Sequence, residues 1–293
     1  SVPMLLSPVS AQNFDSIYYR KSIITAFKEA GFQTAFFSNQ RYNHSFIDFF
    51  GMEADTYDFI KEDSQDSQYN PSDDELLMLV EKELEKGNRK QFIVLHTYGS
   101  HFNYRERYPE TAAFFLPDFP VDAEVKYKDN LMNAYDNSIR YTDNFLARII
   151  HLLKQQQVDA SMLYTSDHGE DIFDDGRHLF LHASPVPSYY QLHVPLLLWT
   201  SDSYREEYPG IEKAASMNRQ KNISSSISFF QTMMELAGIE TPYRNDSLSV
   251  TSPLYTEKSR VYLNDHNEPR PLDDIGMGKE DFEMLKKRGI DAQ

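Results

Sequence analysis

Short apolar runs alternate with helical patterns along most of the chain, and this alternation predicts an α/β fold. The runs that read as buried strands are Thr34–Phe37, Phe92–Leu95, Ser161–Thr165, Val194–Thr200 and Arg260–Asn264. Apolar residues at helical spacing predict helices over about 13–30, 72–87, 122–156, 203–217 and 224–237. Strands separated by helices indicate a largely parallel central sheet with helices on both faces. We expect one domain over residues 1–293.

Ser72 and Glu75 have the spacing of a capping box, which predicts a helix that begins there and ends at Gly87. The charged segment from Asn264 to Gln293 has no predicted role. The longest apolar stretch, Val194 to Trp199, is far shorter than the roughly 20 residues that a membrane-spanning helix needs.

Three predicted strands end in polar clusters: Ser38-Asn39-Gln40, His96 to His101, and Ser166 to Glu170. Because ligands of open α/β sheets gather beyond the carboxyl ends of the strands, these clusters mark the expected site. Asp167 and His168 are the sharpest signal, since a carboxylate beside an imidazole suits zinc or manganese better than calcium. A capped strand end with a solvated Asp is the alternative interpretation.

The other histidines differ in their context. His101 follows a predicted strand, and His178 and His182 lie in the irregular stretch after Asp167. A neutral imidazole binds metal, whereas a protonated one neutralises phosphoryl oxygens or donates a proton to a leaving group. We therefore expect site roles for His101 and His182, and weaker ones for His178 and His193. The ordinary surface interpretation applies to the remaining candidates, His44, His151 and His266.

The composition of the chain argues against nucleic-acid binding and against any site that needs cysteine. The formal net charge of −16 and the lack of a Lys/Arg cluster disfavour nucleic-acid binding, which depends on neutralising phosphates. With no cysteine, the chain has no disulfide framework, thiolate metal site or cysteine nucleophile.

The ordered motifs resemble those of the bacterial phosphoethanolamine transferases, which modify lipopolysaccharide and belong to the alkaline-phosphatase/sulfatase superfamily. The matching segments are Ser1–Met4, Phe37–Gln40, His96–His101 with Arg107–Pro109, Tyr135–Asp143, Ser166–Glu170, Phe180–His182 and His193–Pro195. The series runs through most of the chain in the family's order.

The resemblance implies a mechanism and its residues. A zinc-bound threonine attacks the phosphorus of phosphatidylethanolamine, diacylglycerol leaves, and lipopolysaccharide accepts the group on lipid A or a core sugar. Asp167 and His168 are then metal ligands, with zinc expected and manganese as the alternative. His101 and His182 contact the phosphoryl group, assist proton transfer or hold a second cation, and Asn39 contacts the donor head group.

The same resemblance places the nucleophilic threonine, and the strand that precedes it, upstream of Ser1, so the fragment by itself is expected to be inactive. Full-length relatives carry an N-terminal membrane domain. We therefore expect a bacterial inner-membrane enzyme with this domain in the periplasm. The sequence departs from many relatives at His101-Phe102-Asn103, where they have Gly-Pro after the histidine, and it lacks their cysteines.

Three alternatives remain. A sulfatase needs an arginine where Leu5 stands in Ser1-Val2-Pro3-Met4-Leu5. A phosphoglycerol transferase of the same superfamily shares the metal-bound threonine and differs in its donor. A binding domain that kept the fold without the chemistry is the third.

Overall fold

The computed structural model describes residues 1–61, 70–87, 90–182 and 186–290, and its chain divides into two compact units. Unit 1 comprises residues 1–26, 157–171 and 182–293, and unit 2 comprises 27–156 and 172–181. The family signatures lie in both units. The expectation of one domain over 1–293 stays a prediction.

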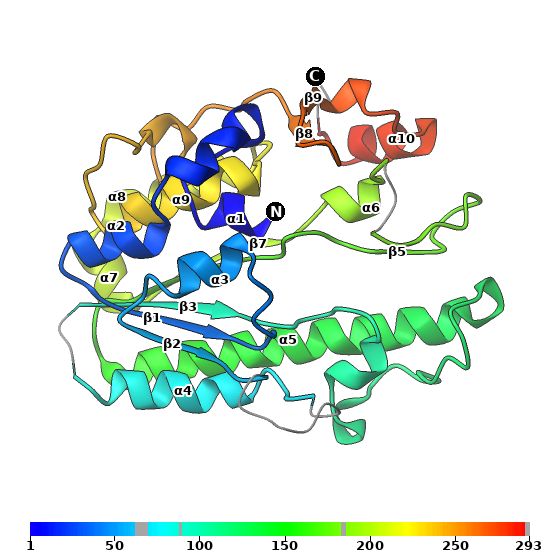
Figure 1. The fold of residues 1–293 in the computed structure, drawn as a ribbon, viewed down its shortest axis with the longest axis horizontal. Coiled ribbons are helices and arrows are strands. Elements are labelled where there is room, and N and C mark those ends of the chain that lie inside the picture. Colours follow the sequence, from blue (N-terminus) through cyan, green and yellow to red (C-terminus); the bar gives the residue numbers. More distant parts are fainter. Residues whose placement is uncertain (62–69, 88–89, 183–185, 291–293) are drawn as a thin grey trace. The chain divides into compact units, whose positions relative to one another are not determined.

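Unit 2 is built on a parallel sheet in the order β2-β1-β3 (Figure 1). Its strands are β1 (Gln33–Ser38), β2 (Thr56–Phe59) and β3 (Gln91–His96). Ser38 pairs with His96 in the register of β1 and β3, so both polar clusters begin at one edge of the sheet. The predicted parallel α/β sheet is confirmed.

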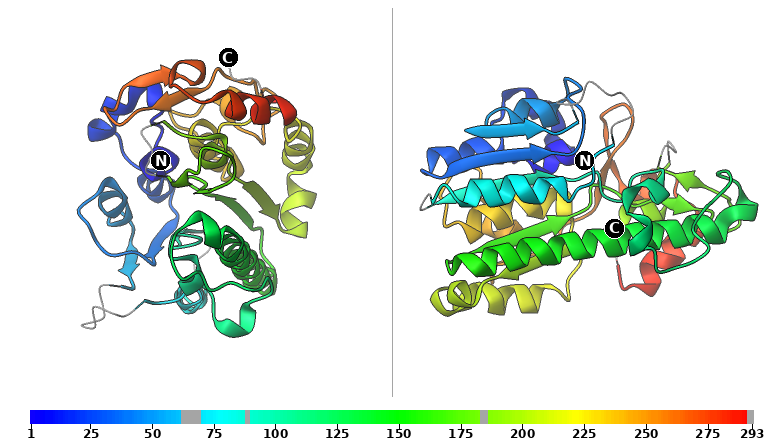
Figure 2. Two further views of the ribbon diagram at one scale, coloured as in Figure 1. Left: turned by 90° about the vertical axis from the view of Figure 1, so that its right-hand side faces the viewer. Right: turned by 90° about the horizontal axis from the view of Figure 1, so that it is seen from below.

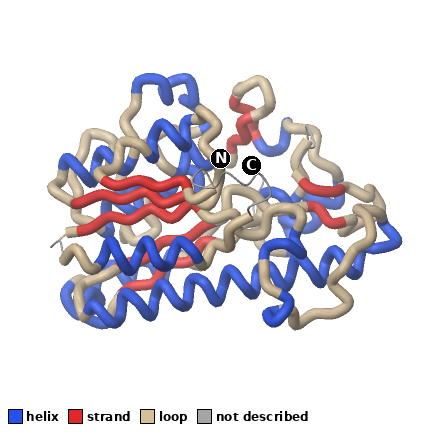
Figure 3. The backbone as a smooth tube through the Cα atoms, turned by 60° about the horizontal axis from the view of Figure 1, so that its bottom comes forward, coloured by secondary structure: helices blue, strands red, loops and turns tan. Residues whose placement is uncertain are grey.

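Helices cover both faces of this sheet. On one face lies α3 (Phe46–Gly51), whose Gly51 packs so closely on the ring of Phe36 that a Cβ atom would lie 2.6 Å from it. On the other lie α4 (Glu75–Leu84) and α5 (Lys128–Gln156), as the ribbon shows (Figure 1). The backbone tube shows helices beside the strands of the sheet (Figure 3). Leu76, Leu77 and Val80 form the buried face of α4, as their helical spacing predicts.

The capping-box prediction is wrong. The helix begins at Glu75 with Asp74 as its N-cap, and no side chain caps it. Ser72 Oγ instead accepts a hydrogen bond from Asp74 N at 3.3 Å, a local turn that competes with a cap.

The segment between β3 and α5 has little regular structure but many contacts. It contains the short 3₁₀ helices η2 (Tyr104–Arg107), η3 (Glu110–Ala112) and η4 (Val125–Tyr127). Asn137 of α5 is fully buried, and its Oδ1 accepts hydrogen bonds from Phe114 N and Phe115 N, both at 2.9 Å. Its Nδ2 donates to Phe115 O at 2.9 Å and to Tyr108 Oη at 3.2 Å. One amide therefore fastens this loop to α5.

Unit 1 contains the antiparallel pair β4 (Ser161–Thr165) and β7 (Leu196–Thr200), in which Leu163 pairs with Leu198. Sequence pattern locates these strands but does not give their direction. The helix α9 (Ser225–Leu236) contacts β4 and α1 (Val2–Leu5).

The remaining elements of unit 1 come from the C-terminal third of the chain. They are α6 (Tyr189–Leu192), α7 (Asp202–Glu207), α8 (Pro209–Asn218), η5 (Asp246–Leu248), β8 (Val261–Leu263), β9 (Pro269–Pro271), η6 (Leu272–Asp274) and α10 (Lys279–Lys287). Residues 261–290, which include the described part of the segment without a predicted role, thus form a hairpin followed by a helix (Figure 2). It packs on α6 through Leu272, Met277 and Leu285 around Tyr189.

Two predicted helices are each divided in the structure. The one expected over 13–30 is a 3₁₀ helix, η1 (Ala11–Tyr19), followed by α2 (Ile23–Glu29). The one expected over 203–217 is α7 and α8, because Pro209 removes a backbone donor and begins a new helix. Between Phe173 and Phe180 the chain connects β5 (Asp171–Ile172) to β6 (Phe180–Leu181). Within the described residues, no helix is both long and apolar enough to span a bilayer.

Candidate functional site

Two imidazoles and a carboxylate converge in unit 1. One ligand atom from each of His168, Glu170 and His182 lies within 4.8 Å of the others. The two imidazole rings lie 3.8 Å apart between centroids. His168 and His182 were predicted from sequence, whereas Glu170 was not, although it is the last residue of the Ser166–Glu170 cluster.

The ring of His168 is oriented by the backbone carbonyl of the next residue, Gly169. Its Nδ1 lies 2.9 Å from the carbonyl oxygen of Gly169, and because a carbonyl can only accept, Nδ1 carries the proton. The Nε2 lone pair is then available to a metal. Asp167 Oδ2 lies 3.6 Å from this Nε2, and the Asp167 side chain is 41% exposed. Asp167 is not one of the three residues of the group, and its role as a metal ligand beside His168 stays a prediction.

Glu170 plays the corresponding part for His182. Its side chain is only 5% exposed, and its Oε1 lies 2.8 Å from His182 Nδ1. An ionised carboxylate accepts from Nδ1–H, so Nε2 is the unprotonated nitrogen of His182. A carboxylate behind a metal-ligating imidazole fixes its tautomer and raises its basicity. Two imidazoles and nearby carboxylates are a donor set that suits zinc.

The segment that carries these residues is fixed to α6. Gly169 N donates to Gln191 O at 2.8 Å, and a Cβ atom at position 169 would collide with the carbonyl oxygen of Tyr190. Only glycine allows this approach. The buried carboxylate of Asp171 accepts hydrogen bonds from Ser188 Oγ at 2.7 Å and Gln191 Nε2 at 2.6 Å. Backbone and side-chain bonds thus hold both ends of the motif.

Ser1 lies near Asp167, since the charge of this carboxylate acts on the Ser1 nitrogen.

His193 lies in the same unit but outside the group. Its Nδ1 is 3.0 Å from Tyr189 Oη, and its ring stacks on that of Tyr189. Burial, followed by the charges of Arg288 and Arg260, lowers the pKa of His193. This histidine buttresses α6 rather than joining the other two.

Two other predicted site residues, Asn39 and His101, lie in unit 2. Asn39 Nδ2 donates to Asp73 Oδ1 at 2.7 Å. Asp73 also accepts from Tyr98 N at 2.8 Å and from Gly99 N at 2.9 Å, so one carboxylate joins Asn39 to the loop that carries His101. Asn39 is 1% exposed, and its Oδ1 has no hydrogen-bond partner among the described residues.

His101 is exposed, and its Nδ1 donates to the carbonyl oxygen of Phe102 at 2.6 Å. The ring of Tyr98, three residues earlier, has two cations near it: Lys61 Nζ at 3.4 Å and Arg107 Cζ at 4.3 Å from its centroid. Burial, followed by the charge of Arg107, lowers the pKa of Lys61 to about 8. His178 lies in unit 2 on an exposed turn and is not in the metal-ligand group.

Comparison with known proteins finds relatives by sequence and by fold. The chain is 36% identical over 157 residues to phosphoethanolamine transferase EptA of Escherichia coli K12, covering 52% of this chain and 28% of that protein. It is 29% identical over 272 residues to the putative transferase YhbX of the same strain, covering 91% and 45%. The chain thus spans less than half the length of these relatives.

The fold matches that of solved periplasmic domains. A zinc complex of the C-terminal periplasmic domain of EptC from Escherichia coli has a TM-score of 0.83 at 23% identity, over 96% of this chain and 79% of that one. The predicted resemblance to phosphoethanolamine transferases is confirmed by these relatives. The family profile described as Sulfatase matches residues 1–239, and the chain therefore belongs to the sulfatase family.

Proposed function

We propose that this chain is the catalytic part of an enzyme that transfers phosphoethanolamine from phosphatidylethanolamine to lipopolysaccharide. The observation that carries the proposal is the group of His168, Glu170 and His182, with Asp167 beside it. Relatives named phosphoethanolamine transferases, including a Kdo(2)-lipid A phosphoethanolamine 7''-transferase of Escherichia coli, support the reaction class. The matched periplasmic domains support a periplasmic location, with membrane attachment by another part of the protein.

In this proposal Asp167 and His168 hold zinc, and the ion supplies the Lewis acidity that favours an alkoxide and offsets phosphoryl charge. Manganese remains the alternative ion. The matched EptC domain is a complex with zinc, which supports the choice of metal. Glu170 keeps His182 Nδ1 protonated, so that His182 Nε2 faces the reacting group as a base or, once protonated, as an acid.

The nucleophile we propose is a threonine directly upstream of Ser1. Because the Ser1 nitrogen lies near Asp167, a residue just before Ser1 would lie near the same carboxylate. The threonine oxygen forms a bond to phosphorus as the bond to diacylglycerol breaks, and the leaving oxygen takes up a proton. An acceptor hydroxyl then displaces the threonine oxygen. His101 is assigned to the phosphoryl group, whereas Asn39, which is 1% exposed and bonded to Asp73, is assigned to support of the loop that carries His101 and not to the head group.

Donor choice and metal content test this proposal. The protein that includes the sequence before Ser1 is incubated with labelled phosphatidylethanolamine or phosphatidylglycerol and lipopolysaccharide, and its metal is measured by mass spectrometry. We expect bound zinc, label transfer from phosphatidylethanolamine alone and loss of transfer with a chelator. Transfer from phosphatidylglycerol would instead support the phosphoglycerol transferase alternative. Release of sulfate from an aryl sulfate would support the sulfatase, and a folded protein without transfer would support the binding domain.

A variant tests the role of Glu170 separately. Glu170→Gln keeps the size of the side chain but offers its amide nitrogen or a weaker acceptor to His182 Nδ1. We expect a changed pH profile of transfer, because the carboxylate sets the tautomer of His182. An unchanged pH profile would remove Glu170 from this role.

A further inference from the structure

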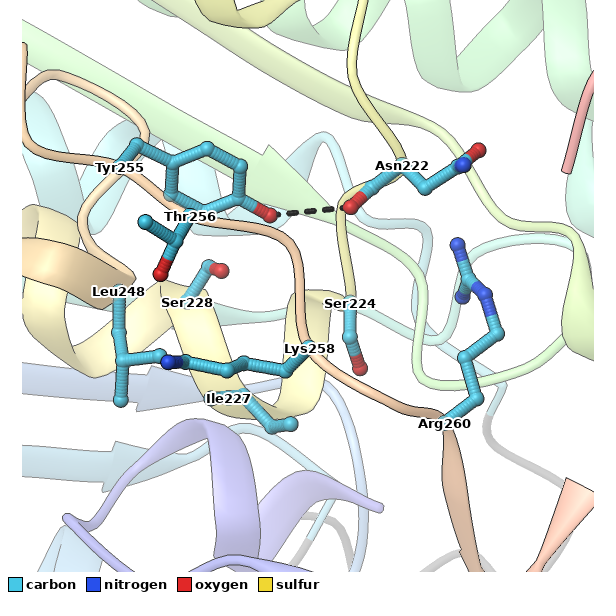
Figure 4. A pocket seen from close by; sticks show the side chains of 9 residues that line it. All are labelled: Asn222, Ser224, Ile227, Ser228, Leu248, Tyr255, Thr256, Lys258 and Arg260. Carbon is cyan, nitrogen blue, oxygen red and sulfur yellow. Dashed lines mark hydrogen bonds between the residues drawn. The ribbon is translucent and has the colours of Figure 1, made fainter. Parts of the chain in front are cut away.

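The pocket of unit 1 that Figure 4 shows is too small for a substrate. It leaves room for about one water molecule. Tyr255, which is 5% exposed, donates from Oη to Asn222 O at 3.1 Å, the bond that Figure 4 marks. Unit 2, by contrast, has an exposed apolar surface that the proposed transfer reaction does not use.

This surface is the apolar loop, residues 114–121, which precedes α5 in the chain. Four of its side chains are at least 63% exposed: Phe114, Leu116, Phe119 and Val121. The one charged residue of the loop, Asp118, is 2% exposed and pairs with Arg105 at 3.3 Å. The side chains that the loop shows to solvent are therefore apolar and uncharged. Exposed apolar groups gathered in this way mark contact with another protein or with a membrane.

The backbone of the apolar loop is bonded to one face of α5. Three asparagines share that face, at a spacing of three and four residues: Asn130, Asn133 and Asn137. Their Nδ2 groups donate, at 3.1, 2.9 and 2.9 Å, to the carbonyl oxygens of Phe119, Pro117 and Phe115. Asn137 also accepts from Phe114 N and Phe115 N, and Pro117 and Pro120 have no N–H group. These backbone groups therefore do not depend on water.

A backbone that does not depend on water suits contact with a lipid layer. The hydrocarbon of a bilayer offers no hydrogen bonds, so polar backbone groups close to it must be satisfied within the protein. A protein partner, by contrast, brings polar groups of its own to an interface. The asparagine bonds of the apolar loop therefore favour lipid as the partner.

An unpaired cation lies beside the apolar loop. The guanidinium carbon of Arg140 lies 4.2 Å from the centroid of the Phe114 ring. Arg140 is exposed and forms no ion pair within the part of the chain that the structure describes. A guanidinium next to apolar groups reaches the phosphates of lipid head groups while its neighbours contact the layer beneath. The charge of Arg140 thus complements the phosphate of a phospholipid.

We propose that the apolar loop docks on a phospholipid bilayer, with Leu116 and Phe119 in the apolar layer and Arg140 at the phosphates. This contact is separate from the membrane attachment that another part of the protein supplies. The inference rests on the proposed function in one respect: the donor is a lipid of that bilayer. Because the formal charge of the chain is −16, the bilayer that suits it is zwitterionic rather than anionic.

Vesicle binding tests the proposal without donor or acceptor. The 293-residue chain is mixed with vesicles of phosphatidylcholine, which contain no phosphoethanolamine, and the bound fraction is measured by flotation. We expect the chain to float with the vesicles in proportion to the lipid added. A chain that stays in the aqueous fraction at every lipid concentration would overturn the proposal.

Variants locate the contact. Phe119→Asp and Leu116→Asp should each weaken vesicle binding about tenfold, because a charge replaces an apolar side chain that leaves water. Arg140→Gln should weaken binding less. Leu254→Asp is the matched control and should bind as the wild type does, since Leu254 is 64% exposed but lies in unit 1. Circular dichroism checks that each variant folds. Wild-type binding in both loop variants would exclude this loop as the contact.

A fluorescent probe shows whether the loop enters the apolar layer. The chain has one tryptophan, Trp199 in β7, so Phe119→Trp adds a second at the loop. Vesicles with brominated acyl chains should quench the emission of Phe119→Trp strongly and that of the control Leu254→Trp weakly. Equal quenching in the two variants would contradict insertion of the loop.

A protein partner predicts a different outcome. If the apolar loop joined two copies of the chain, the mass in solution would rise with concentration, and Phe119→Asp would abolish the rise. That result without vesicle binding would overturn the assignment to lipid. Because the vesicles hold neither donor nor acceptor, a failure to bind leaves the transferase proposal standing, and a failed transfer assay leaves the vesicle result intact.

Discussion

The metal segment of unit 1, residues 166–171 with His182, and the histidine loop of unit 2, residues 96–101, fix their imidazoles in different ways. In the metal segment a buried carboxylate twelve residues away orients His182, and α6 supports the backbone. In the loop, the ring of His101 bonds to the carbonyl of the very next residue, while the support comes from Asp73 beneath the backbone.

The two ways of holding an imidazole suit two different tasks, metal binding and contact with a substrate. Ligands of a metal must keep their lone pairs converged, and this needs partners drawn from distant parts of the chain. A histidine that meets a substrate needs a firm backbone and an accessible ring. The exposed His101, on a loop held through Asp73, fits the second task, and His168 fits the first.

His168→Ala should have the largest effect of the variants considered. It removes one donor atom of the metal segment and leaves the histidine loop intact. We expect zinc affinity to fall about a hundredfold or more, measured by competition with a chromogenic chelator. The exposed His266→Ala is the matched control and should bind zinc normally. Equal affinity in the two variants would exclude His168 as a ligand.

Gly169→Ala tests the support of the metal segment. The added methyl group meets the Tyr190 carbonyl oxygen, and backbone cannot move aside as a side-chain tip can. We expect the free energy of unfolding to fall by about 2 kcal/mol, measured in urea, since overpacking costs about 1–3 kcal/mol. Gly210→Ala, which has open space around its Cβ position, is the control. A stable Gly169→Ala variant would show that α6 does not press on this segment.

Asp73→Asn tests the support of the histidine loop. The new amide can keep one acceptor oxygen, but its NH₂ group faces a donor that the carboxylate had satisfied. We expect a loss of about 1.5 kcal/mol, because an unsatisfied buried donor costs about 1–3 kcal/mol. Hydrogen exchange at the Gly99 amide should accelerate, while zinc affinity stays unchanged. Protection at Gly99 equal to that of the wild type would contradict this role of Asp73.

Lys61→Met tests the lowered pKa of Lys61, beside the histidine loop, through the pH dependence of stability. The folded pKa of about 8 lies below the ordinary lysine value of 10.5, so between these values the unfolded chain holds more protons on Lys61 than the folded chain does. The stability of the wild type relative to Lys61→Met should therefore rise with pH, by about 1 kcal/mol between about pH 8 and 9.5. Parallel stability curves for the two proteins across this window would refute the low pKa.

Much of the fold was predictable because it depends on local pattern. The strand ending at Ser38, the long α5 and the motif at Asp167 follow from apolar spacing and from the residues that terminate it. The roles of Glu170 and Asp73 were not predicted, since their partners lie 12 and at least 25 residues away. The failed cap at Ser72 has a related cause: two local hydrogen-bond patterns compete, and the tertiary contacts of Asp73 and Asp74 select one.

The buried amide of Asn137 has a consequence for the loop that it fastens. Phe114, Leu116 and Phe119 are each more than 60% exposed, yet the loop backbone is held from beneath by α5. The hydrogen bonds of Asn137 to the loop backbone thus hold the loop without using these exposed side chains. Such a loop can exchange its outward side chains for others of quite different chemistry and still present them at the same place.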